Sequence, residues 1–600
     1  MPSPSDETAL TPDVVVVGDP TAEEEPPAAP EAGIVARAMT WGRRTGPMVR
    51  GLFAFLLYLI AAIVVWAGPI LSDFGTRYVG DGYWDAKAYQ WFMGWMHWSL
   101  SNGVDPLYTH KIFTPDGTSL VWQAFTPTAG ILMYPVRSLF GSLVATNTIL
   151  VLSSVLACWG AYLVCNRITR AFWPSIVGGY LFGYSQYMVG QLHGHVNLVL
   201  IFPVPIAAYL IIRRIEGSMG RVRFVALLTL TLIALFLSST ELFAMTAFFG
   251  GIAFLITLAL SGERWRRVLW AGVLTIASFA LSALVLLPYL IAVARNAPPD
   301  TVHDITNASS DLASFIVPRN ITLLSTDATL RWSDTFTAKA VEDAAYLSIP
   351  LVAMLVWYAI SERRRRQTWG LLAFVTIASM AALGPVLHVM GNASVTMPWS
   401  LADHVPLLRN AIPSRFPAYS ALAVGVIAAI WLARAPSRSA PIRWGLVLLG
   451  ALMLFPNQGK IAHVPQTVPA FFTSGQYRNV LRQDEVVVAI PKERAGEMLW
   501  QDDADFWFRL AEGYVGPLPS AYAGEPLNKG FQAGATPFAT PSGFVSWLDE
   551  RQATAIVLAD QGNEVYGSFL HSIGAQMVYE GGGVSVWRPA SGTWSASGTG

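Results

Sequence analysis

Long apolar runs alternate with short polar connections over most of this 600-residue chain. Each run is long enough, as an α-helix, to cross a hydrocarbon layer of about 30 Å. The pattern therefore predicts an α-helical polytopic membrane protein with about eleven transmembrane helices. The expected spans are residues 51–71, 142–165, 172–190, 196–213, 222–239, 241–260, 268–293, 345–361, 369–390, 416–434 and 443–459.

Arginines mark one side of these spans. Because basic residues concentrate in the cytoplasmic loops of membrane proteins, their positions predict the orientation. They gather before or after alternate spans, at Arg43, Arg44, Arg50, Arg167, Arg170, Arg213, Arg214, Arg221, Arg223, Arg264, Arg266, Arg267, Arg363, Arg364, Arg365, Arg366, Arg434, Arg438 and Arg443. We expect a cytoplasmic N-terminus and, after an odd number of spans, an extracytoplasmic C-terminus.

The segments outside the spans differ in composition. Residues 1–40 are rich in Asp, Glu, Pro and Ala, and we expect a disordered acidic cytoplasmic tail. Residues 41–459 are expected to form the transmembrane domain, whose first extracytoplasmic loop, 72–141, is long. All long polar segments lie on the extracytoplasmic side, so we expect the chemistry there.

The C-terminal segment, 460–590, is predicted to be a small extracytoplasmic α/β domain. Residues 485–491 and 554–559 have the apolar pattern of buried strands, and a hairpin is expected around Gly581-Gly-Gly583. The Gly- and Ser-rich residues 591–600 are expected to form a flexible tail.

Composition narrows the class of protein further. Charged residues make up only 13% of the chain and apolar residues 53%, which excludes an ordinary soluble protein. The formal net charge is zero, so no nucleic-acid partner is expected. Cys158 and Cys165 are about 10 Å apart along one predicted helix, too far for a disulfide.

Two carboxylates, Asp81 and Asp85, follow the first span almost directly. Beyond them, Trp84, Trp91, Trp95 and Trp98 fall on one helical stripe, and we expect this helix to lie flat in the interface with its indoles at headgroup depth. If the helix begins early, a spacing of four places both carboxylates on one face. Alternatively, Asp85 caps the helix N-terminus, which leaves Asp81 without an evident structural role.

An acidic residue just beyond the first span, beside interfacial helices, resembles the GT-C superfamily of integral-membrane glycosyltransferases. Three segments add to this resemblance: Asp105-Pro-Leu-Tyr108, Gly194-His-Val-Asn-Leu198 and Leu408-Arg-Asn-Ala-Ile-Pro-Ser-Arg-Phe416. The resemblance implies a bacterial plasma-membrane enzyme that uses a polyprenyl-phosphate-linked sugar donor. Its acceptor would be a cell-envelope glycan, lipid or protein on the extracytoplasmic face, among membrane lipids.

The expected chemistry needs one base. An inverting transfer from a sugar phosphate requires a base for the acceptor hydroxyl, whereas the phosphate leaves without a general acid. We expect Asp81 in this role, with a pKa raised by partly apolar surroundings, and Asp85 as the second catalytic carboxylate or a cap. The chain has Asp-Gly-Tyr-Trp-Asp where several GT-C families have Asp-x-Asp, so a divalent metal is unsupported and no cofactor is expected.

Further polar residues on the same side are expected to bind substrate: His193, His195, Glu241, Arg409 and Arg415. The histidines occupy the turn between the third and fourth spans, where an ordinary hydrogen-bonded turn is the alternative. Glu241 interrupts a long apolar stretch, and a hairpin turn at 239–241 would spare it the cost of about 2.5–3.5 kcal/mol for a charge within the bilayer. Both arginines precede the tenth span, and the guanidinium fork suits a phosphate.

Two other functions are consistent with the sequence. One is a transporter or flippase of a lipid-linked glycan, although such proteins often show inverted repeats and midplane charges, and neither pattern is clear here. The other is a non-catalytic envelope assembly protein whose external domain recruits partners. An essential Asp81 would separate the enzyme from both.

Overall fold

The computed structural model describes residues 46–297, 305–404, 411–490, 494–516, 518–522, 524–533, 540–560 and 563–596. The predicted acidic tail and Arg409 lie outside the described residues. From Pro47 onward the chain forms one compact unit, so that loops and helices distant in sequence can be related to one another.

Seven helical stretches in the described ranges are long and apolar enough to cross a membrane, and two shorter apolar helices accompany them. The seven are Pro47–Asp73, Ser142–Thr169, Val196–Ile215, Arg221–Ser238, Thr240–Leu260, Gly262–Val285 and Pro413–Ala433. The chain is therefore a multi-pass membrane protein. The count is lower than the expected eleven because four expected spans, 172–190, 345–361, 369–390 and 443–459, are shorter or broken here.

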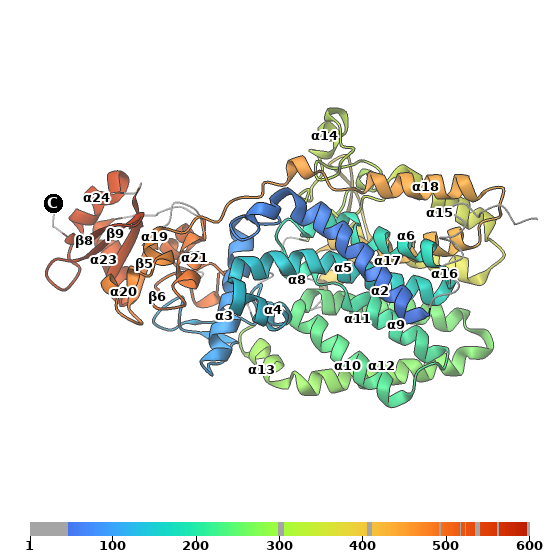
Figure 1. Ribbon diagram of the computed structural model, residues 1–600, viewed down its shortest axis with the longest axis horizontal. Helices are drawn as coiled ribbons and strands as arrows, with labels where there is room; N and C mark the ends of the chain where they lie inside the picture. Colours follow the sequence, from blue (N-terminus) through green and yellow to red (C-terminus); the bar gives the residue numbers. More distant parts are fainter. Residues whose placement is uncertain are drawn as a thin grey trace, which may run out of the picture. The chain divides into compact units, whose positions relative to one another are not determined.

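The helices of the membrane part follow one another in chain order (Figure 1). They are α2 (Pro47–Ala62), α5 (Ser142–Thr169), α6 (Phe172–Gly183), α7 (Gln186–Gln191), α8 (Val196–Val199), α9 (Pro203–Ile215), α10 (Arg221–Ser238), α11 (Thr240–Leu260), α12 (Trp265–Val285), α13 (Leu287–Arg295), α14 (Asp327–Ser333), α15 (Ile349–Ser361), α16 (Arg366–Ala382), α17 (Pro417–Ala433) and α18 (Ala440–Met453). A two-stranded ribbon, β3 (Val386–Val389) with β4 (Asn392–Thr396), follows α16.

Helices α5, α6 and α17 form the centre of the membrane part (Figure 1). A Cβ on Gly178 of α6 would lie 2.6 Å from the Gly425 carbonyl oxygen of α17, so only glycine allows this approach. Helix α6 ends at Gly183, and the polar residues that follow form the separate helix α7. The expected continuous span 172–190 is therefore wrong, and its polar end is free to line a site.

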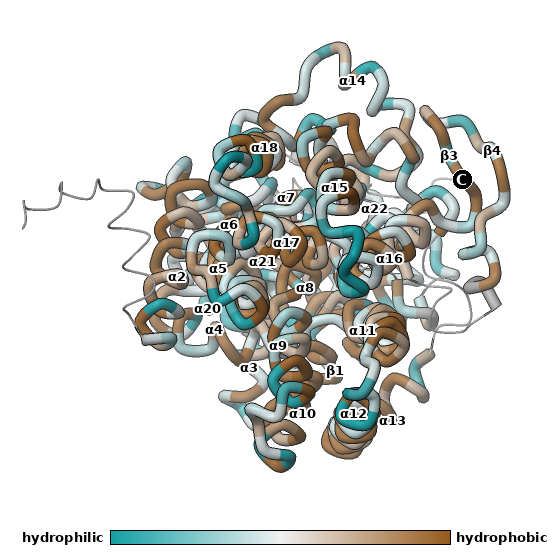
Figure 2. Tube along the Cα trace, turned by 90° about the vertical axis from the view of Figure 1, so that its right-hand side faces the viewer, coloured by the Kyte–Doolittle hydropathy of each residue, from teal (hydrophilic) through white to brown (hydrophobic). Residues whose placement is uncertain are grey.

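The arginine-rich connections face one way. Figure 2 looks onto the end of the helices away from the C-terminal sheet, and it shows hydrophilic segments after α9, before α12, between α15 and α16 and before α18. The predicted hairpin turn at Glu241 is confirmed, because α10 ends at Ser238 and Ser239 caps α11 through its side chain. Glu241 thus begins α11 at the end opposite the arginines of the α11–α12 connection.

The first loop holds α3 (Trp84–Ser101), α4 (Pro127–Phe140) and the short strands β1 (Tyr108–Thr109) and β2 (Thr118–Ser119). The expectation that the indoles of α3 lie at headgroup depth is wrong for Trp91 and Trp95. Trp91 and Trp95 are fully buried, and Phe506 of the C-terminal segment packs against both rings at 5.5 and 5.7 Å. The indole of Trp91 also donates to Gln501 (2.8 Å). Protein therefore covers the middle of the stripe, at Trp91 and Trp95.

The C-terminal segment builds a five-stranded sheet in the order β6-β5-β7-β9-β8 (Figure 1). Its elements are α19 (Ala470–Thr473), α20 (Tyr477–Val480), β5 (Val486–Ile490), α21 (Gly496–Asp503), β6 (Arg509–Leu510), α22 (Pro526–Ala533), α23 (Pro541–Glu550), β7 (Ala555–Ala559), α24 (Asn563–Ser572), β8 (Ala575–Gly581) and β9 (Val584–Pro589). The expected strands and hairpin are confirmed. All residues of β5 are buried, as is usual for a strand with parallel neighbours on both sides.

Backbone hydrogen bonds join the first loop to this sheet. The amide of Leu510 donates to the Lys111 carbonyl (2.8 Å), and the amides of Phe113 and Thr114 donate to the carbonyls of Glu512 and Leu510 (both 3.2 Å). Helix α21 packs on α3 (Figure 1). The first loop and the C-terminal segment therefore share one interface, which brings residues about 400 positions apart to the same place.

The buried tryptophan of α3 predicts a large stability effect. We expect Trp91→Ala to lower the free energy of unfolding by about 3–5 kcal/mol, because it opens a cavity and leaves the side-chain oxygen of Gln501 without its donor. Trp270→Ala is the control, since Trp270 is 61% exposed on α12. Thermal unfolding in detergent measures both, and equal losses would contradict the packing of α3 against the C-terminal segment.

A second prediction concerns Asp502 at the same interface, where its carboxylate accepts from Ser142 (3.0 Å). Burial raises the pKa of Asp502 to about 7, although Arg137 opposes the shift. The folded state therefore binds this proton more tightly than the unfolded state, and stability falls as pH rises from about 4 to about 7. We expect Asp502→Asn to flatten this slope in melting temperature, whereas Asp505→Asn, at a 61% exposed side chain, preserves it.

Candidate functional site

Asp81 is held by two elements that are distant in sequence. One carboxylate oxygen, Oδ2, lies 2.7 Å from Nδ1 of His193, and the other, Oδ1, accepts from the Ala462 amide at 2.9 Å. The Asp81 amide donates to the His193 carbonyl (3.0 Å). A Cβ on Gly80 would lie 2.6 Å from that carbonyl oxygen, so glycine at this position permits the contact. Side chain and backbone together fix Asp81 to the His193 turn.

Asp85 lies in the first turn of α3, which begins after Tyr83, so it is not the N-cap. Its Oδ1 accepts a hydrogen bond from the Tyr514 hydroxyl at 2.6 Å. Its Oδ2 lies 3.6 Å from Nε2 of His195. The two first-loop acids do not share a helical face, but each faces one histidine of the 193–195 turn.

A buried charge network adjoins the histidines. Arg415 forms a two-pronged ion pair with Glu342, through Nε at 2.8 Å and Nη2 at 2.9 Å, and its Nη1 contacts Glu241 at 2.5 Å. The Gln191 side chain donates to Glu342 (3.2 Å). The other carboxylate oxygen of Glu342 lies 3.9 Å from Nε2 of His195. The network thus joins Glu241 and Arg415, through Glu342, to the histidine turn.

These contacts bring six of the seven predicted site residues together: Asp81, Asp85, His193, His195, Glu241 and Arg415. The seventh, Arg409, lies outside the described residues. Arg415 is not an open phosphate ligand here, since all three of its guanidinium nitrogens contact glutamates. Sequence reasoning missed Glu342, although the rule that selected Asp81, an acid at the outer lip of a span, also applies to it.

The electrostatics of the two first-loop acids differ from the expectation. Burial by itself raises the pKa of Asp81, but the hydrogen bonds from His193 and the Ala462 amide outweigh it, and the pKa is lowered. The same holds for Asp85, where burial is outweighed by His195, Tyr514 and Arg494. The predicted rise in the pKa of Asp81 is therefore wrong in direction, because apolar surroundings act together with strong donors. Both groups are carboxylates at neutral pH.

Glu342 is also ionised. Burial raises its pKa, but Arg415 and His195 more than compensate and hold the pKa well below its usual range. Four carboxylates thus face one guanidinium group and two imidazoles. Such a cluster at the outer ends of membrane helices suits the recognition of a hydroxyl-rich ligand and the removal of a proton from it.

Each of the two imidazoles has one ring nitrogen that forms no hydrogen bond within the described residues. Nε2 of His193 and Nδ1 of His195 are buried, and no hydrogen-bond partner for either occurs in the described part of the chain. Because a buried polar atom without a partner costs stability, such atoms require an explanation, and a ligand provides one. Within the described ranges, no group of three or more His, Cys, Asp or Glu side chains is arranged to hold a metal ion.

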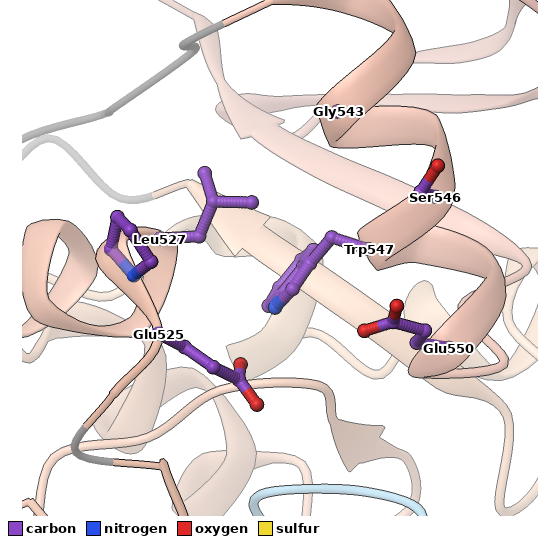
Figure 3. Close-up of a pocket in the computed structure, with 7 residues that line it drawn as sticks. Glu525, Leu527, Gly543, Ser546, Trp547 and Glu550 are labelled. Carbon is purple, nitrogen blue, oxygen red and sulfur yellow. The ribbon is translucent and has the colours of Figure 1, made fainter.

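A separate hollow lies in the C-terminal segment, between α22 and α23. Figure 3 shows Trp547 and Glu525 facing each other across it, with Leu527, Gly543, Ser546 and Glu550 around them. The Glu525 carboxylate already accepts from Arg551 (2.5 Å) and Asn528 (2.6 Å). The hollow contains none of the predicted site residues and is not part of the cluster above.

The fold has relatives among solved structures. The chain is similar to the arabinofuranosyltransferase AftD from Mycobacteria, with a TM-score of 0.55 and 12% sequence identity. The alignment covers 90% of this chain but only 40% of AftD, so the chain spans less than half the length of that protein. This likeness concerns the fold, and it confirms the predicted GT-C-like architecture.

Two further matches are weaker. The oligosaccharyltransferase AglB from Archaeoglobus fulgidus matches with a TM-score of 0.47 and 10% identity over 90% of this chain and 74% of its own. ArnT from Cupriavidus metallidurans matches with a TM-score of 0.46 and 11% identity over 90% of this chain and 98% of its own.

No curated protein matches the chain in a comparison of sequences. A family model does match, and it covers residues 54–454, which hold the membrane helices and every residue of the cluster except the contacts from the C-terminal segment. Since this is more than half of the chain, the protein belongs to the family described as "Domain of unknown function (DUF6311)".

Proposed function

We propose that the protein is a membrane glycosyltransferase that takes a sugar from a polyprenyl-phosphate-type donor. The acceptor is a hydroxyl of a cell-envelope glycan, lipid or protein. The observation that carries this proposal is the cluster of ionisable groups around the 193–195 turn. His193 pairs with Asp81, and a chain of ion-pair distances runs from Asp85 through His195, Glu342 and Arg415 to Glu241. A GT-C-like fold with such a cluster at the ends of its helices supports transfer at the membrane surface.

The reaction needs little from the protein beyond a base and a positioned donor. The acceptor oxygen bonds to the anomeric carbon, the bond from that carbon to the phosphate oxygen breaks, and the lipid phosphate leaves with the electron pair. The acceptor proton passes to a carboxylate. Asp81 is the base expected from the sequence, and Asp85 is the second carboxylate beside it; both are ionised and able to accept a proton.

The proposed orientation follows from the charges. The cluster lies where α11 and α17 begin, whereas the arginine-rich connections follow the other ends of these helices. Because arginine-rich loops favour the cytoplasm, the cluster faces the extracytoplasmic side of a bacterial plasma membrane, and the N-terminus is cytoplasmic. A donor carried by a lipid reaches this side without a nucleotide.

Replacing the acids tests the function directly. In a deletion strain we expect Asp81→Asn and Asp85→Asn, at matched expression, to fail to restore the envelope glycan profile while a lipid-linked sugar accumulates. Loss of a general base lowers the rate by about 10²–10⁴-fold. Mass spectrometry of extracted lipids and glycans measures both effects.

Asp116→Asn is the control for this experiment, because Asp116 is an exposed acid of the same loop. It should restore the wild-type profile. If both site variants also restore it, the carboxylates are structural and the transferase proposal fails in favour of transport or scaffolding.

The role of Arg415 is testable separately. We expect Arg415→Met to lower the free energy of unfolding by about 3–5 kcal/mol, because Glu241 and Glu342 lose their buried cation. The double variant Glu342→Gln with Arg415→Met should recover part of this loss. Arg434→Met is the control, since its pair with Glu362 (3.3 Å) is partly exposed and such pairs contribute about 1 kcal/mol or less. An unchanged melting temperature with lost transfer would instead assign Arg415 to the donor phosphate.

A further inference from the structure

The two first-loop acids are held in the same way, each between one histidine and the C-terminal segment. Asp81 has both oxygens within hydrogen-bond distance of a partner, His193 and the Ala462 amide. Asp85 has one such bond, from Tyr514, and its Oδ2 is 3.6 Å from His195. The side chain of Asp81 is 14% exposed and that of Asp85 is 42% exposed. Asp85 therefore has the more open oxygen.

The position of Tyr514 is set by the pairing of the first loop with the C-terminal sheet. The Phe113 amide donates to the Glu512 carbonyl (3.2 Å), two residues before the tyrosine. The Tyr514 amide donates to the Met498 sulfur (3.5 Å), and the guanidinium carbon of Arg494 lies 5.1 Å from the ring centre. Tyr514 is only 7% exposed, so its hydroxyl has little freedom to turn away from Asp85.

We propose that Tyr514 is a positioning residue of the active site: its hydroxyl occupies Oδ1 of Asp85, so that Oδ2 is left to take the acceptor proton. Asp85 then acts as the base in place of Asp81, whose two oxygens are both engaged. This inference rests on the proposed glycosyltransferase function and deepens it. It makes the C-terminal segment part of the catalytic centre, whereas the sequence suggested a separate external domain. The proton moves from the acceptor hydroxyl to Oδ2, while the proton of Tyr514 stays on its oxygen.

The groups around Asp85 make this role measurable. Tyr514 and Arg494 face it from the C-terminal segment, His195 from the turn before α8, and Tyr89 from its own helix. Burial raises the pKa of Asp85, whereas His195, Tyr514 and Arg494 lower it. Burial and Asp85 raise the pKa of Tyr514, which keeps it a donor. Removing the Tyr514 hydroxyl should therefore raise the pKa of Asp85.

Tyr522 provides a matched control. It is also a buried tyrosine of the C-terminal segment, and its hydroxyl donates to first-loop carbonyls, those of Phe113 (3.0 Å) and Gly117 (3.1 Å). Tyr522→Phe removes bonds across the same interface but touches no carboxylate of the cluster. A purely structural effect should therefore be shared by Tyr514→Phe and Tyr522→Phe.

The test compares these variants as full chains in detergent and in membranes. A carboxyl group whose pKa is lower in the folded state than in the unfolded state stabilises the folded state at pH values above the unfolded pKa of about 4. This stabilisation is lost as the pH falls through the folded pKa. We expect Tyr514→Phe to lower the melting temperature more at neutral pH than at pH 3, and to have no pH-dependent effect in an Asp85→Asn background. Tyr522→Phe should lower the melting temperature equally at all pH values.

Transfer is measured with the lipid-linked sugar fraction extracted from the deletion strain. We expect Tyr514→Phe to reduce kcat/KM by about 10-fold or more. It should also move the acidic limb of the plot of kcat/KM against pH to higher pH, whereas Tyr522→Phe leaves that limb unchanged. An unmoved limb, or an equal shift in both variants, overturns the inference. If the wild type transfers no sugar while the pH-dependent coupling of Tyr514 to Asp85 persists, the proposed function fails and the positioning of Asp85 stands. If Tyr514→Phe lowers the melting temperature equally at all pH values, the coupling itself is refuted.

Discussion

The pairing of Arg415 with Glu342 and Glu241 is the contact on which the rest of the site depends. A buried guanidinium group meets two carboxylates that are 19% and 16% exposed at the ends of membrane helices, and the buried cation would be costly there without them. Their pairing fixes the start of α17, the start of α11 and the segment before α15 with respect to one another. Gln191 extends the network to α7, and through it the histidine turn reaches the first-loop acids. One set of charges thus holds the starts of α11 and α17, the segment before α15 and the end of α7.

A second constraint comes from the first loop and the C-terminal segment, which fold as one body. Backbone bonds between residues 111–114 and 510–512, and the ring contacts of Trp91 and Trp95 with Phe506, leave little independent movement. As a consequence, Ala462 and Tyr514 reach carboxylates of a loop that lie 381 and 429 residues earlier in the chain. A segment that looks external in sequence therefore influences the protonation of the site.

The charges of the cluster indicate more about chemistry than the fold does. The GT-C-like architecture is shared with AftD at low sequence identity and says nothing about substrate. The cluster holds four carboxylates near one arginine that is already engaged. In the proposed transfer this balance favours removing a proton from a hydroxyl over neutralising a phosphate, and binding of the proposed donor would require either release of Arg415 or cations from outside this network.

Local chemistry alone determined much of this protein. The apolar runs predicted the seven long membrane helices, the turn at Ser239 and the strands β5, β7, β8 and β9, and the polar residues beside the spans predicted six members of the cluster. Period, length and the cost of a charge in lipid act within a short window. Only the tertiary structure decided that Trp91 and Trp95 of α3 are covered by protein, that Arg415 is engaged by two glutamates, and that the pKa of Asp81 is lowered. Each of these depends on partners such as Phe506, Glu342 and Ala462, which no local pattern brings together.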